Sequence, residues 1–376
     1  MSTLAATNSQ LPTNQGTAAE NPARLWMPRQ VLFTPAALAE SWGQQIYQRV
    51  SRLGLPITEL KSNRITGLKG DSERETYAKA KQTMAVVTAP PSAFKLQPIP
   101  PSADWQFHLA QGCPAHCQYC YLASSLSGPP VIRVFANLPD ILKNTRHYVG
   151  QSAGRSKNEA SPLPTSFEVS CYTDPLSIEH LTGSLGECIR YFGTQRNQRL
   201  RWVSKFDNVE PLLNIPHHRH TRCRVSLNAD PVSHSFEGGT AAVGDRLTAL
   251  RKLALPTARG GGGYPVGLVI APIMTFENWQ MHYESLFEQI AATLNFECDL
   301  TFELISHRFT DKSKQVLNEW YPNSQLEMQP EARSLKRNKF GGIKYVYNKS
   351  TTHALRSFFE LKITQYFPQA ELLYWT

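Results

Sequence analysis

The sequence has 376 residues, of which 41% are hydrophobic, and it carries a formal net charge of +9. This length favours one large α/β domain with an appendage, and the lack of an 18-residue apolar run excludes a membrane-spanning helix. The seven cysteines, three of them clustered, argue against a secreted disulfide framework and favour a metal site in a reducing cytoplasm.

The N-terminal part divides into a tail and a structured layer. Residues Met1–Pro22 are rich in Ser, Thr, Ala, Asn and Gln and contain no Lys or Arg, which predicts a disordered tail rather than a targeting peptide. Residues 23–100 are expected to form an α/β layer. A strand is predicted at Val31–Phe33, a helix from about Ala36 to Leu53, and a proline-rich exit at Pro90–Pro101.

The middle of the chain alternates between strand-like and helix-like stretches. The clearest helix is Glu277–Asn295, which Thr275 can cap. Alternation of this kind predicts a parallel sheet with right-handed crossovers. Six units are too few to close an eight-stranded barrel. Residues 101–310 are therefore predicted to form a partial (β/α)6 barrel with its active site at the C-terminal ends of the strands. The six predicted strands are Trp105–Ala110, Phe167–Thr173, Leu200–Phe206, Cys223–Leu227, Val266–Ile273 and Leu300–Arg308.

Directly after the first predicted strand come three cysteines with spacings of three and two residues, namely Cys113, Cys117 and Cys120. Simple electron carriers bind a [4Fe–4S] cluster through four thiolates. Three thiolates leave one iron open, and an open iron can chelate S-adenosylmethionine. One-electron reduction then releases a 5′-deoxyadenosyl radical, while the protein orients and shields the reaction. The motif therefore predicts a radical S-adenosylmethionine (SAM) enzyme.

The alternative is a structural zinc site, with His116 or a remote cysteine as fourth ligand. Zinc sites usually place their cysteines in CxxC pairs. A triplet that follows a strand and begins a series of β/α units fits that pattern poorly, so the sequence favours the radical enzyme.

Around these cysteines the chain resembles the spore photoproduct lyase family, radical SAM enzymes that repair a thymine dimer in DNA. The resemblance extends from about Pro28 to Thr376, and the aromatic ending Leu373–Thr376 is also similar. It implies an activity that splits 5-thyminyl-5,6-dihydrothymine back to two thymines. The matching stretches are Gln30–Phe33, Cys113–Leu122, Ile132–Val134, Phe167–Leu185, Arg201–Leu213, Val225–Asn228, Val269–Ile273, Thr301–Thr310 and Gly342–Tyr347.

The resemblance implies roles for several residues at the strand ends. The three clustered cysteines would bind the cluster. Cys171 would give a hydrogen atom to the repaired thymine radical, although a free cysteine is more often a small buried hydrophobe. Tyr119 and Tyr121 would relay a hydrogen atom back, or else pack around the cluster and the adenine. One departure is Tyr172, which replaces a small polar residue of the family beside Cys171.

Four further residues would contact SAM according to the same resemblance. Lys205, at the end of the third predicted strand, would pair with the methionine carboxylate, unless it is a solvated charge. Ser226 and Asn228, at the end of the fourth, would hold the ribose or the amino acid. Thr173 stands where the family has a serine, and Tyr121 can also contact the cofactor.

A basic segment near the C-terminus predicts contact with DNA. Residues Glu331–Lys349 contain six basic side chains against one acidic side chain, with aromatic residues between them, and Gly341–Gly342 predict a hairpin. Basic groups follow phosphates, and aromatic groups stack on bases. Lys339 and Phe340 occupy the place of a basic–aromatic pair that enters the lesion site in the family, and Arg308 is a further candidate. The alternative is a solvated charged loop.

The sequence therefore predicts four regions. They are a tail at 1–22, an α/β layer at 23–100, a radical SAM barrel at 101–310, and a hairpin and helix extension at 311–376. The expected partners are UV-damaged DNA and a one-electron donor such as a flavodoxin or ferredoxin, without a membrane. Two other functions remain open: a radical SAM enzyme of this fold with another nucleic-acid or small-molecule substrate, and a DNA-binding redox sensor.

Overall fold

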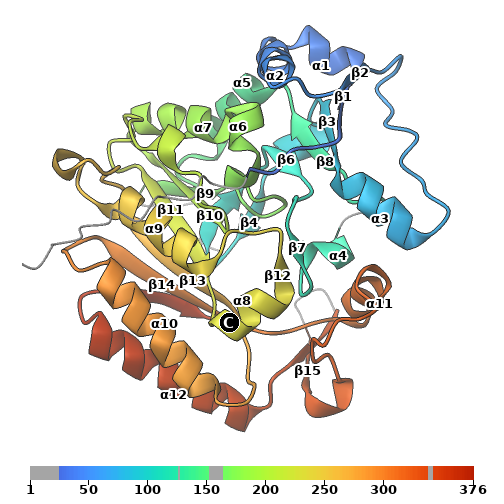
Figure 1. Cartoon of the computed structure of the whole chain (residues 1–376). Coiled ribbons are helices and arrows are strands. Elements are labelled where there is room, and N and C mark those ends of the chain that lie inside the picture. Colours follow the sequence, from blue (N-terminus) through green and yellow to red (C-terminus); the bar gives the residue numbers. More distant parts are fainter. Residues whose placement is uncertain (1–24, 126–127, 152–163, 338–341) are drawn as a thin grey trace, which may run out of the picture.

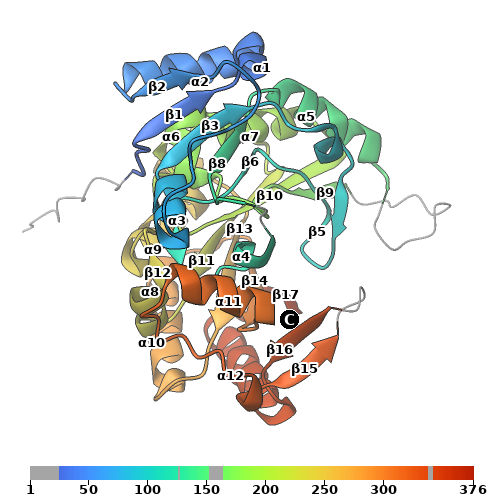
Figure 2. The ribbon, with the colours of Figure 1, turned by 90° about the vertical axis from the view of Figure 1, so that its right-hand side faces the viewer.

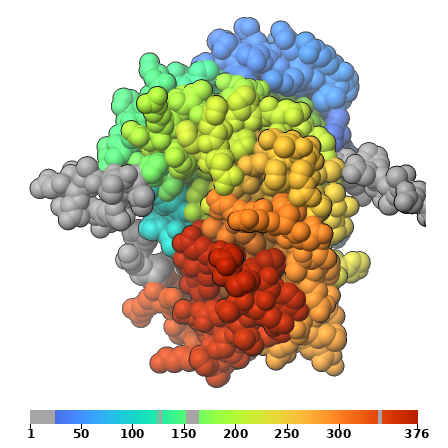
Figure 3. All heavy atoms as spheres, turned by 90° about the vertical axis from the view of Figure 1, so that its left-hand side faces the viewer, coloured from blue at the N-terminus to red at the C-terminus, as the bar shows by residue number. Residues whose placement is uncertain are grey.

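The computed structural model describes residues 25–125, 128–151, 164–337 and 342–376, so the expected N-terminal tail lies outside the described residues. A large curled sheet with helices on its convex side occupies the centre, and a smaller sheet lies at the N-terminal end (Figure 1). On one face the chain order is visible directly, from N-terminal residues at one end to C-terminal residues at the other (Figure 3).

The smaller sheet has five strands in the order β2-β1-β3-β8-β6. Its first four strands are parallel, and β6 runs antiparallel to β8. Because β6 and β8 come from beyond residue 100, this sheet is not confined to the expected 23–100 layer. Its strands are β1 (Gln30–Phe33), β2 (Ile57–Glu59), β3 (Thr83–Val87), β6 (Ala110–Gln111) and β8 (Ile132–Phe135).

The large sheet has eight strands in the order β17-β14-β13-β11-β10-β9-β5-β4. All its pairings are parallel except that of β4 with β5. The central strand β13 is buried along nearly its whole length, as expected for a parallel strand covered on both faces. The strands are β4 (Gln97–Ile99), β5 (Ala103–Gln106), β9 (Thr165–Glu168), β10 (Gln198–Ser204), β11 (Thr221–Leu227), β13 (Val266–Ile273), β14 (Leu300–Ser306) and β17 (Glu371–Trp375).

Each of the six predicted strands overlaps a strand of this sheet, and these six lie side by side in chain order from β5 to β14. The sheet extends beyond them at both edges. At one edge β17 pairs with β14. The C-terminal segment thereby covers backbone groups that would otherwise be exposed on an edge strand. At the other edge β4 covers β5.

Side chains alternate between the two faces of the large sheet, as the pleat requires. On β10 the buried Leu200 and Trp202 point to the convex face, whereas Arg201 points to the concave face. The convex face packs on α7 and α9, and α10 packs in turn on α9 and α12. The concave face carries charged and polar groups, which places chemistry there.

Helices connect the strands. The predicted helix from Ala36 to Leu53 is two helices, and the N-cap of α10 is Asn278 rather than Thr275. The helices are α1 (Pro35–Ala39), α2 (Ser41–Arg52), α3 (Glu73–Lys81), α4 (Leu122–Ser125), α5 (Leu138–Asn144), α6 (Glu179–Thr182), α7 (Ser184–Thr194), α8 (Asp230–Phe236), α9 (Val243–Ala254), α10 (Trp279–Thr293), α11 (Asp311–Trp320) and α12 (Lys349–Tyr366). In the described part of the chain, none is long and apolar enough to cross a membrane.

The predicted hairpin is formed by β15 (Ser334–Arg337) and β16 (Ile343–Val346), which pair antiparallel. It projects below α11, beside the C-terminal helix α12 (Figure 2). An isolated bridge between Phe309 and Tyr345 joins the hairpin to the segment after β14. Its base is therefore held near the C-terminal edge of the large sheet.

Candidate active site

The three clustered cysteines lie on the loop between β6 and α4. Gly112 precedes them with φ +88°, and a Cβ there would lie 2.5 Å from the carbonyl oxygen of Val131, so glycine is required. The Gly112 N–H donates to the carbonyl of Tyr172 at 2.9 Å, which ties the loop to the segment after β9. His116–Cys117 form the short strand β7, which pairs with β12 (Glu237–Gly238).

Helix α3 of the N-terminal layer supports this loop from behind. The buried ammonium of Lys81 donates to the carbonyl oxygens of Cys113 and Ala115. The hydroxyl of Tyr77 lies 2.9 Å from Nδ1 of His116, the side chain considered above as a zinc ligand. Sequence reasoning missed Lys81 and Tyr77, because they belong to an ordinary helix that lies outside the stretches that resemble the family.

The thiols of Cys113, Cys117 and Cys120 are partly buried and close enough to influence one another. Burial raises the pKa of Cys113 to about 11 and that of Cys117 to about 12, although nearby lysines act in the opposite direction. A buried thiolate therefore needs added positive charge, which bound metal supplies.

A [4Fe–4S] cluster fits this arrangement better than one zinc ion. Within the described residues, no three His, Cys, Asp or Glu side chains converge closely enough for a single metal ion. A cluster binds each thiolate through a different iron, so its cysteines lie further apart than the ligands of one zinc. The three thiols are thus compatible with a cluster.

Lys205, just after β10, is the centre of a buried charge network. Its ammonium contacts Glu237 at 2.5 Å, the hydroxyl of Tyr119 at 2.7 Å and the carbonyl oxygen of Ala271 at 3.3 Å. Glu237 also pairs with Arg246 at 2.7 Å. Burial alone would raise the pKa of Glu237, but the two cations outweigh it and lower the pKa to about 2. In this structure the charge of Lys205 is thus balanced within the chain.

Glu237 and Arg246 are site residues that sequence reasoning did not find. Both are buried, and Arg246 also donates to the carbonyl oxygen of Ser226 at 3.1 Å. Through them the strand end that carries Ser226 is connected to Lys205 and Tyr119. The only signal in the sequence was an acid and an arginine between two strands, which is indistinguishable from surface charge.

The other three residues expected to contact SAM differ in how far their polar groups are already engaged. The hydroxyl of Thr173 is buried and has no hydrogen-bond partner in the described part of the chain. The carboxamide of Asn228 donates to Pro272 at 2.8 Å and accepts from Tyr283 at 3.0 Å. Ser226 lies on β11 two residues before Asn228, so the two side chains share a face, and Ser226 is also buried. An orphaned buried hydroxyl is expected where a ligand completes the site.

Cys171 follows β9 at the C-terminal edge of the sheet. The hydroxyl of Tyr121 donates to its carbonyl oxygen, although the tyrosine is 60% exposed. Burial is the main cause that raises the pKa of the Cys171 thiol, and the carboxylate of Glu168 adds to it, whereas Arg224 lowers it. The structure therefore brings the backbone of Cys171 beside Tyr121, the residue that follows Cys120.

Beneath Cys171 the concave face carries an ion-pair network across five strands. Arg224 on β11 is 3% exposed and pairs with Glu168 on β9 and with Glu303 on β14 at 2.7 Å. Arg201 on β10 also pairs with Glu303, and Tyr374 on β17 donates to it at 2.5 Å. Buried charges of this kind are tolerated only when they are paired and hydrogen-bonded.

The two described strands of the hairpin carry basic side chains and no acidic ones, although the hydroxyl of Tyr345 donates to Asp311 at 3.4 Å. Lys336 on β15 lies directly opposite Lys344 on β16. Burial lowers the pKa of Lys344, and the charges of Arg308 and Lys336 lower it further. Arg308 is therefore near the hairpin, as expected of a residue that contacts DNA. The pair Lys339 and Phe340 lies outside the described residues.

Comparison with known proteins gives consistent matches over nearly the whole chain. A family model described as spore photoproduct lyase matches residues 26–376. The chain is 37% identical to a spore photoproduct lyase of Geobacillus sp. (strain Y412MC61) and 36% identical to one of Bacillus subtilis (strain 168). Each match spans 354 residues, which is 93% of this chain and 99% of the relative.

Solved structures agree with these relatives. Two structures of spore photoproduct lyase match with a TM-score of 0.85 and 36% identity, over 94% of this chain and 100% of theirs. One is a double mutant with bound AdoMet (SAM) and dinucleoside spore photoproduct, and the other is complexed with dinucleoside spore photoproduct.

Proposed function

The chain belongs to the spore photoproduct lyase family, and from this we propose that it splits 5-thyminyl-5,6-dihydrothymine in DNA back to two thymines. Bound together, a [4Fe–4S] cluster and SAM supply a 5′-deoxyadenosyl radical that abstracts hydrogen from the lesion. The observation that carries the proposal is the position of Cys171 at the end of β9, tied through Tyr121 to the cysteine loop.

We assign the cofactor contacts as follows. Cys113, Cys117 and Cys120 hold the cluster, because their burial requires the positive charge of iron. Lys205, Thr173, Ser226, Asn228 and Tyr121 surround SAM. The orphaned hydroxyl of Thr173 supports this directly. For Lys205 the assignment requires that its ammonium contacts Glu237 and the methionine carboxylate at the same time.

Cys171 donates a hydrogen atom from its S–H bond to the thymine radical left after the inter-base bond breaks. Burial and Glu168 keep this side chain protonated, which the transfer requires. Tyr121 and Tyr119 would then restore the S–H bond by relaying a hydrogen atom from the 5′-methyl group of 5′-deoxyadenosine, whose C–H bond breaks so that the cofactor can be re-formed. The contact of the Tyr121 hydroxyl with the backbone of Cys171 supports this order.

DNA contact falls to the hairpin and to Arg308. Like charges directly opposite each other destabilise a β-ladder, so Lys336 opposite Lys344 is explained by a polyanion that lies across both. We propose from the family resemblance that Lys339 and Phe340, which lie outside the described residues, enter the lesion site. A lesion inside a duplex cannot reach the concave face of the barrel, so the dinucleotide is extruded from the stack.

We further propose that residues 101–310 form the catalytic unit as a partial (β/α)6 barrel. The rest of the chain would follow the four-region organisation predicted from the sequence. An electron donor of the flavodoxin or ferredoxin type reduces the cluster. All seven cysteines are free, which favours the reducing cytoplasm as the place where the protein acts.

The test uses anaerobically reconstituted, reduced protein and an oligonucleotide that contains the lesion. We expect the lesion to revert to two adjacent thymines within the strand, with formation of 5′-deoxyadenosine, and binding of about four irons. A Cys117→Ala variant is the control and should give neither product. Cleavage of SAM without repair of the lesion would assign the fold to another substrate.

A further inference from the structure

A cavity of about 280 Å³ lies at the end of β5, beside the proposed site but outside the residues assigned to it. It is formed by the segment around the short helix η1 (Pro91–Phe94), by β4, β5, β6 and β8, and by the residue that follows Cys171. Its size approaches the lower end of small-molecule pockets, about 300–1,000 Å³. That volume suits one nucleoside rather than a dinucleotide lesion.

The cavity opens on the concave face of the large sheet. Phe107 points to the convex face, where its ring stacks on Phe192 of α7 with centroids 5.9 Å apart. Because neighbouring residues of an extended segment point to opposite faces, Gln106 and His108 point to the concave face. Gln97 on β4 lies directly opposite Gln106 and adds a second carboxamide to the same wall.

Gln97 donates to the carbonyl oxygen of Lys95 at 3.2 Å, but several other polar groups of this cavity make no hydrogen bond within the described residues. Nδ1 of His108 is buried and has no hydrogen-bond partner among the described residues. In the same described part, the carboxamides of Gln106 and Gln111 and the guanidinium of Arg133 also have none. Burial lowers the pKa of His108 to about 4, so its ring is neutral and can accept as well as donate. Gln106, Gln111 and Arg133 are half-buried, whereas Nδ1 of His108 is a buried polar atom without a partner, which is expected where a ligand completes a site.

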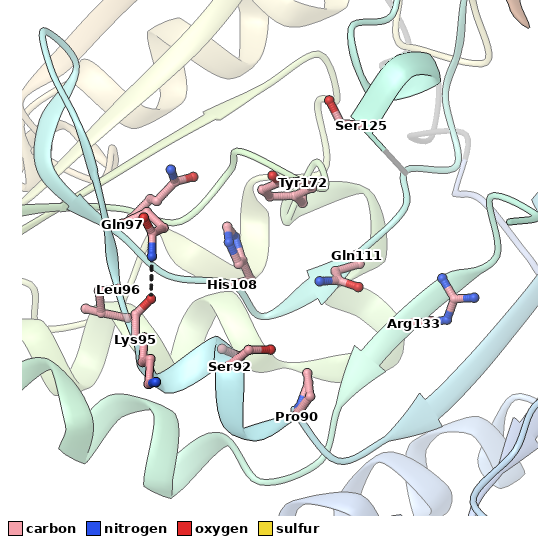
Figure 4. A pocket seen from close by; sticks show the side chains of 12 residues that line it. Pro90, Ser92, Lys95, Leu96, Gln97, His108, Gln111, Ser125, Arg133 and Tyr172 are labelled. Carbon is pink, nitrogen blue, oxygen red and sulfur yellow. Dashed lines mark hydrogen bonds between the residues drawn. The ribbon is translucent and has the colours of Figure 1, made fainter. Parts of the chain in front are cut away.

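The charge of the lining is of one sign. Figure 4 shows Arg133 at one end of the cavity and Lys95 at the other, with His108 and Tyr172 between them. Among the described residues that line the cavity, none is acidic. Two separated cations suit a ligand with anionic groups on both sides, and a nucleotide within a DNA strand has a phosphate on each side.

The aromatic wall adds a stacking surface. The ring of Tyr172 meets that of His108 edge-on with centroids 4.6 Å apart. Aromatic side chains stack on any base, and carboxamides reach the hydrogen-bonding edges of bases. Tyr172 also follows Cys171 directly, so a ligand here lies next to the lesion.

We propose that this cavity binds the undamaged nucleotide that flanks the lesion on the same DNA strand. Arg133 and Lys95 contact its phosphates, Gln106, Gln111 and His108 contact the base edge, and Tyr172 stacks on the base. The inference rests on the proposed repair function and adds to it a flanking-nucleotide subsite, which anchors the strand while the lesion enters the barrel.

The test compares two substrates that differ only in flanking nucleotides, namely a lesion-containing oligonucleotide and the dinucleoside lesion. Arg133→Met should weaken oligonucleotide binding in fluorescence anisotropy and reduce the slope of log K against log salt by about 1. Tyr172→Leu should weaken binding about tenfold, whereas Tyr172→Phe should retain it. Turnover of the dinucleoside, which has no flanking nucleotide, should be unchanged in every variant.

Arg52→Met is the matched control, because it removes the same charge from the exposed end of α2 and should leave binding unchanged. Equal losses on both substrates would place the cavity in the lesion site, and no loss on either would exclude the subsite. Tight binding of free thymidine 5′-monophosphate that Arg133→Met abolishes would identify a free nucleotide as the ligand and overturn the proposal. A wild-type protein that is inactive on the dinucleoside would contradict the repair function alone, since anisotropy still tests the subsite.

Discussion

At the scale of single residues, the protonation state of Cys171 decides what the site can do. Hydrogen-atom transfer needs an S–H bond, which a thiolate lacks. Burial raises the pKa of this thiol, and the carboxylate of Glu168 raises it further. Many reactive cysteines are activated by a lowered pKa. The environment of Cys171 acts in the opposite direction, which favours a hydrogen donor over a nucleophile.

Replacing Cys171 with alanine should change which products form rather than whether SAM is cleaved. The variant should still release 5′-deoxyadenosine and open the lesion, because the thiol acts after bond cleavage. The thymine radical should then be trapped by reductant-derived species or solvent-borne donors, and abnormal adducts should accumulate. Mass spectrometry of the digested oligonucleotide measures this outcome.

Cys188→Ala is a suitable control, since Cys188 is fully buried on α7 and packs in the core. It should lower stability modestly and leave the products normal. Clean thymine as the sole product of Cys171→Ala would eliminate the hydrogen-donor role and leave Cys171 as a packing residue.

At the scale of elements, two features of the β15–β16 hairpin lower its stability as an isolated hairpin. Lys336 and Lys344 face each other across the ladder, and the exposed Leu335 adds apolar surface beside them. Neither feature helps an isolated hairpin. Both are useful if a phosphate backbone lies across the strands and bases lie near the tip.

Lys336→Gln should therefore have opposite effects on stability and on binding. Removal of the like-charge contact should stabilise the hairpin by about 0.2–1 kcal/mol. Loss of one phosphate contact should weaken DNA binding and reduce its salt slope by about 1. Hydrogen exchange of the hairpin amides and anisotropy titrations at several salt concentrations measure the two effects.

Lys61→Gln removes an equal charge from an exposed position in the N-terminal layer and should change neither quantity. If Lys336→Gln and Lys61→Gln weaken binding equally, the effect comes from net charge, and the hairpin is not a specific contact surface.

At the scale of the whole molecule, the concave charge network joins strands that are distant in sequence. Arg224 connects β9 to β14, and Glu303 connects this pair to Arg201 and Tyr374. Every member is paired, so the network holds the curled sheet in one arrangement beneath Cys171. Removal of one partner would leave the others as uncompensated buried charges.

Arg224→Met should lower the free energy of unfolding by about 3–5 kcal/mol, because Glu168 loses its only cationic partner among the described residues and Glu303 loses one of two. Urea denaturation of the reconstituted protein measures this change. The matched variant is Arg219→Met, which breaks an exposed pair with Asp299 and should lower stability by less than about 1 kcal/mol. Similar losses in the two variants would show that the interior network has no special role.

The sequence by itself determined the local features. The six strands were predicted from composition and alternation, and the cluster site was predicted from the spacing of the three cysteines. The antiparallel hairpin was predicted from Gly341–Gly342 and its flanking arms. All of these depend on interactions between residues near one another in the chain.

The tertiary structure decided the partners. The pairing of Lys205 with Glu237, the support of the cysteine loop by Lys81, and the pairing of β17 with β14 each join segments that are distant in sequence. The flanking cavity likewise combines residues from η1, four strands and the end of β9. A residue's type and its face are local properties, but its contact across the core depends on how the sheet curls. That curl arises only when all strands, and the helices on their convex face, pack together.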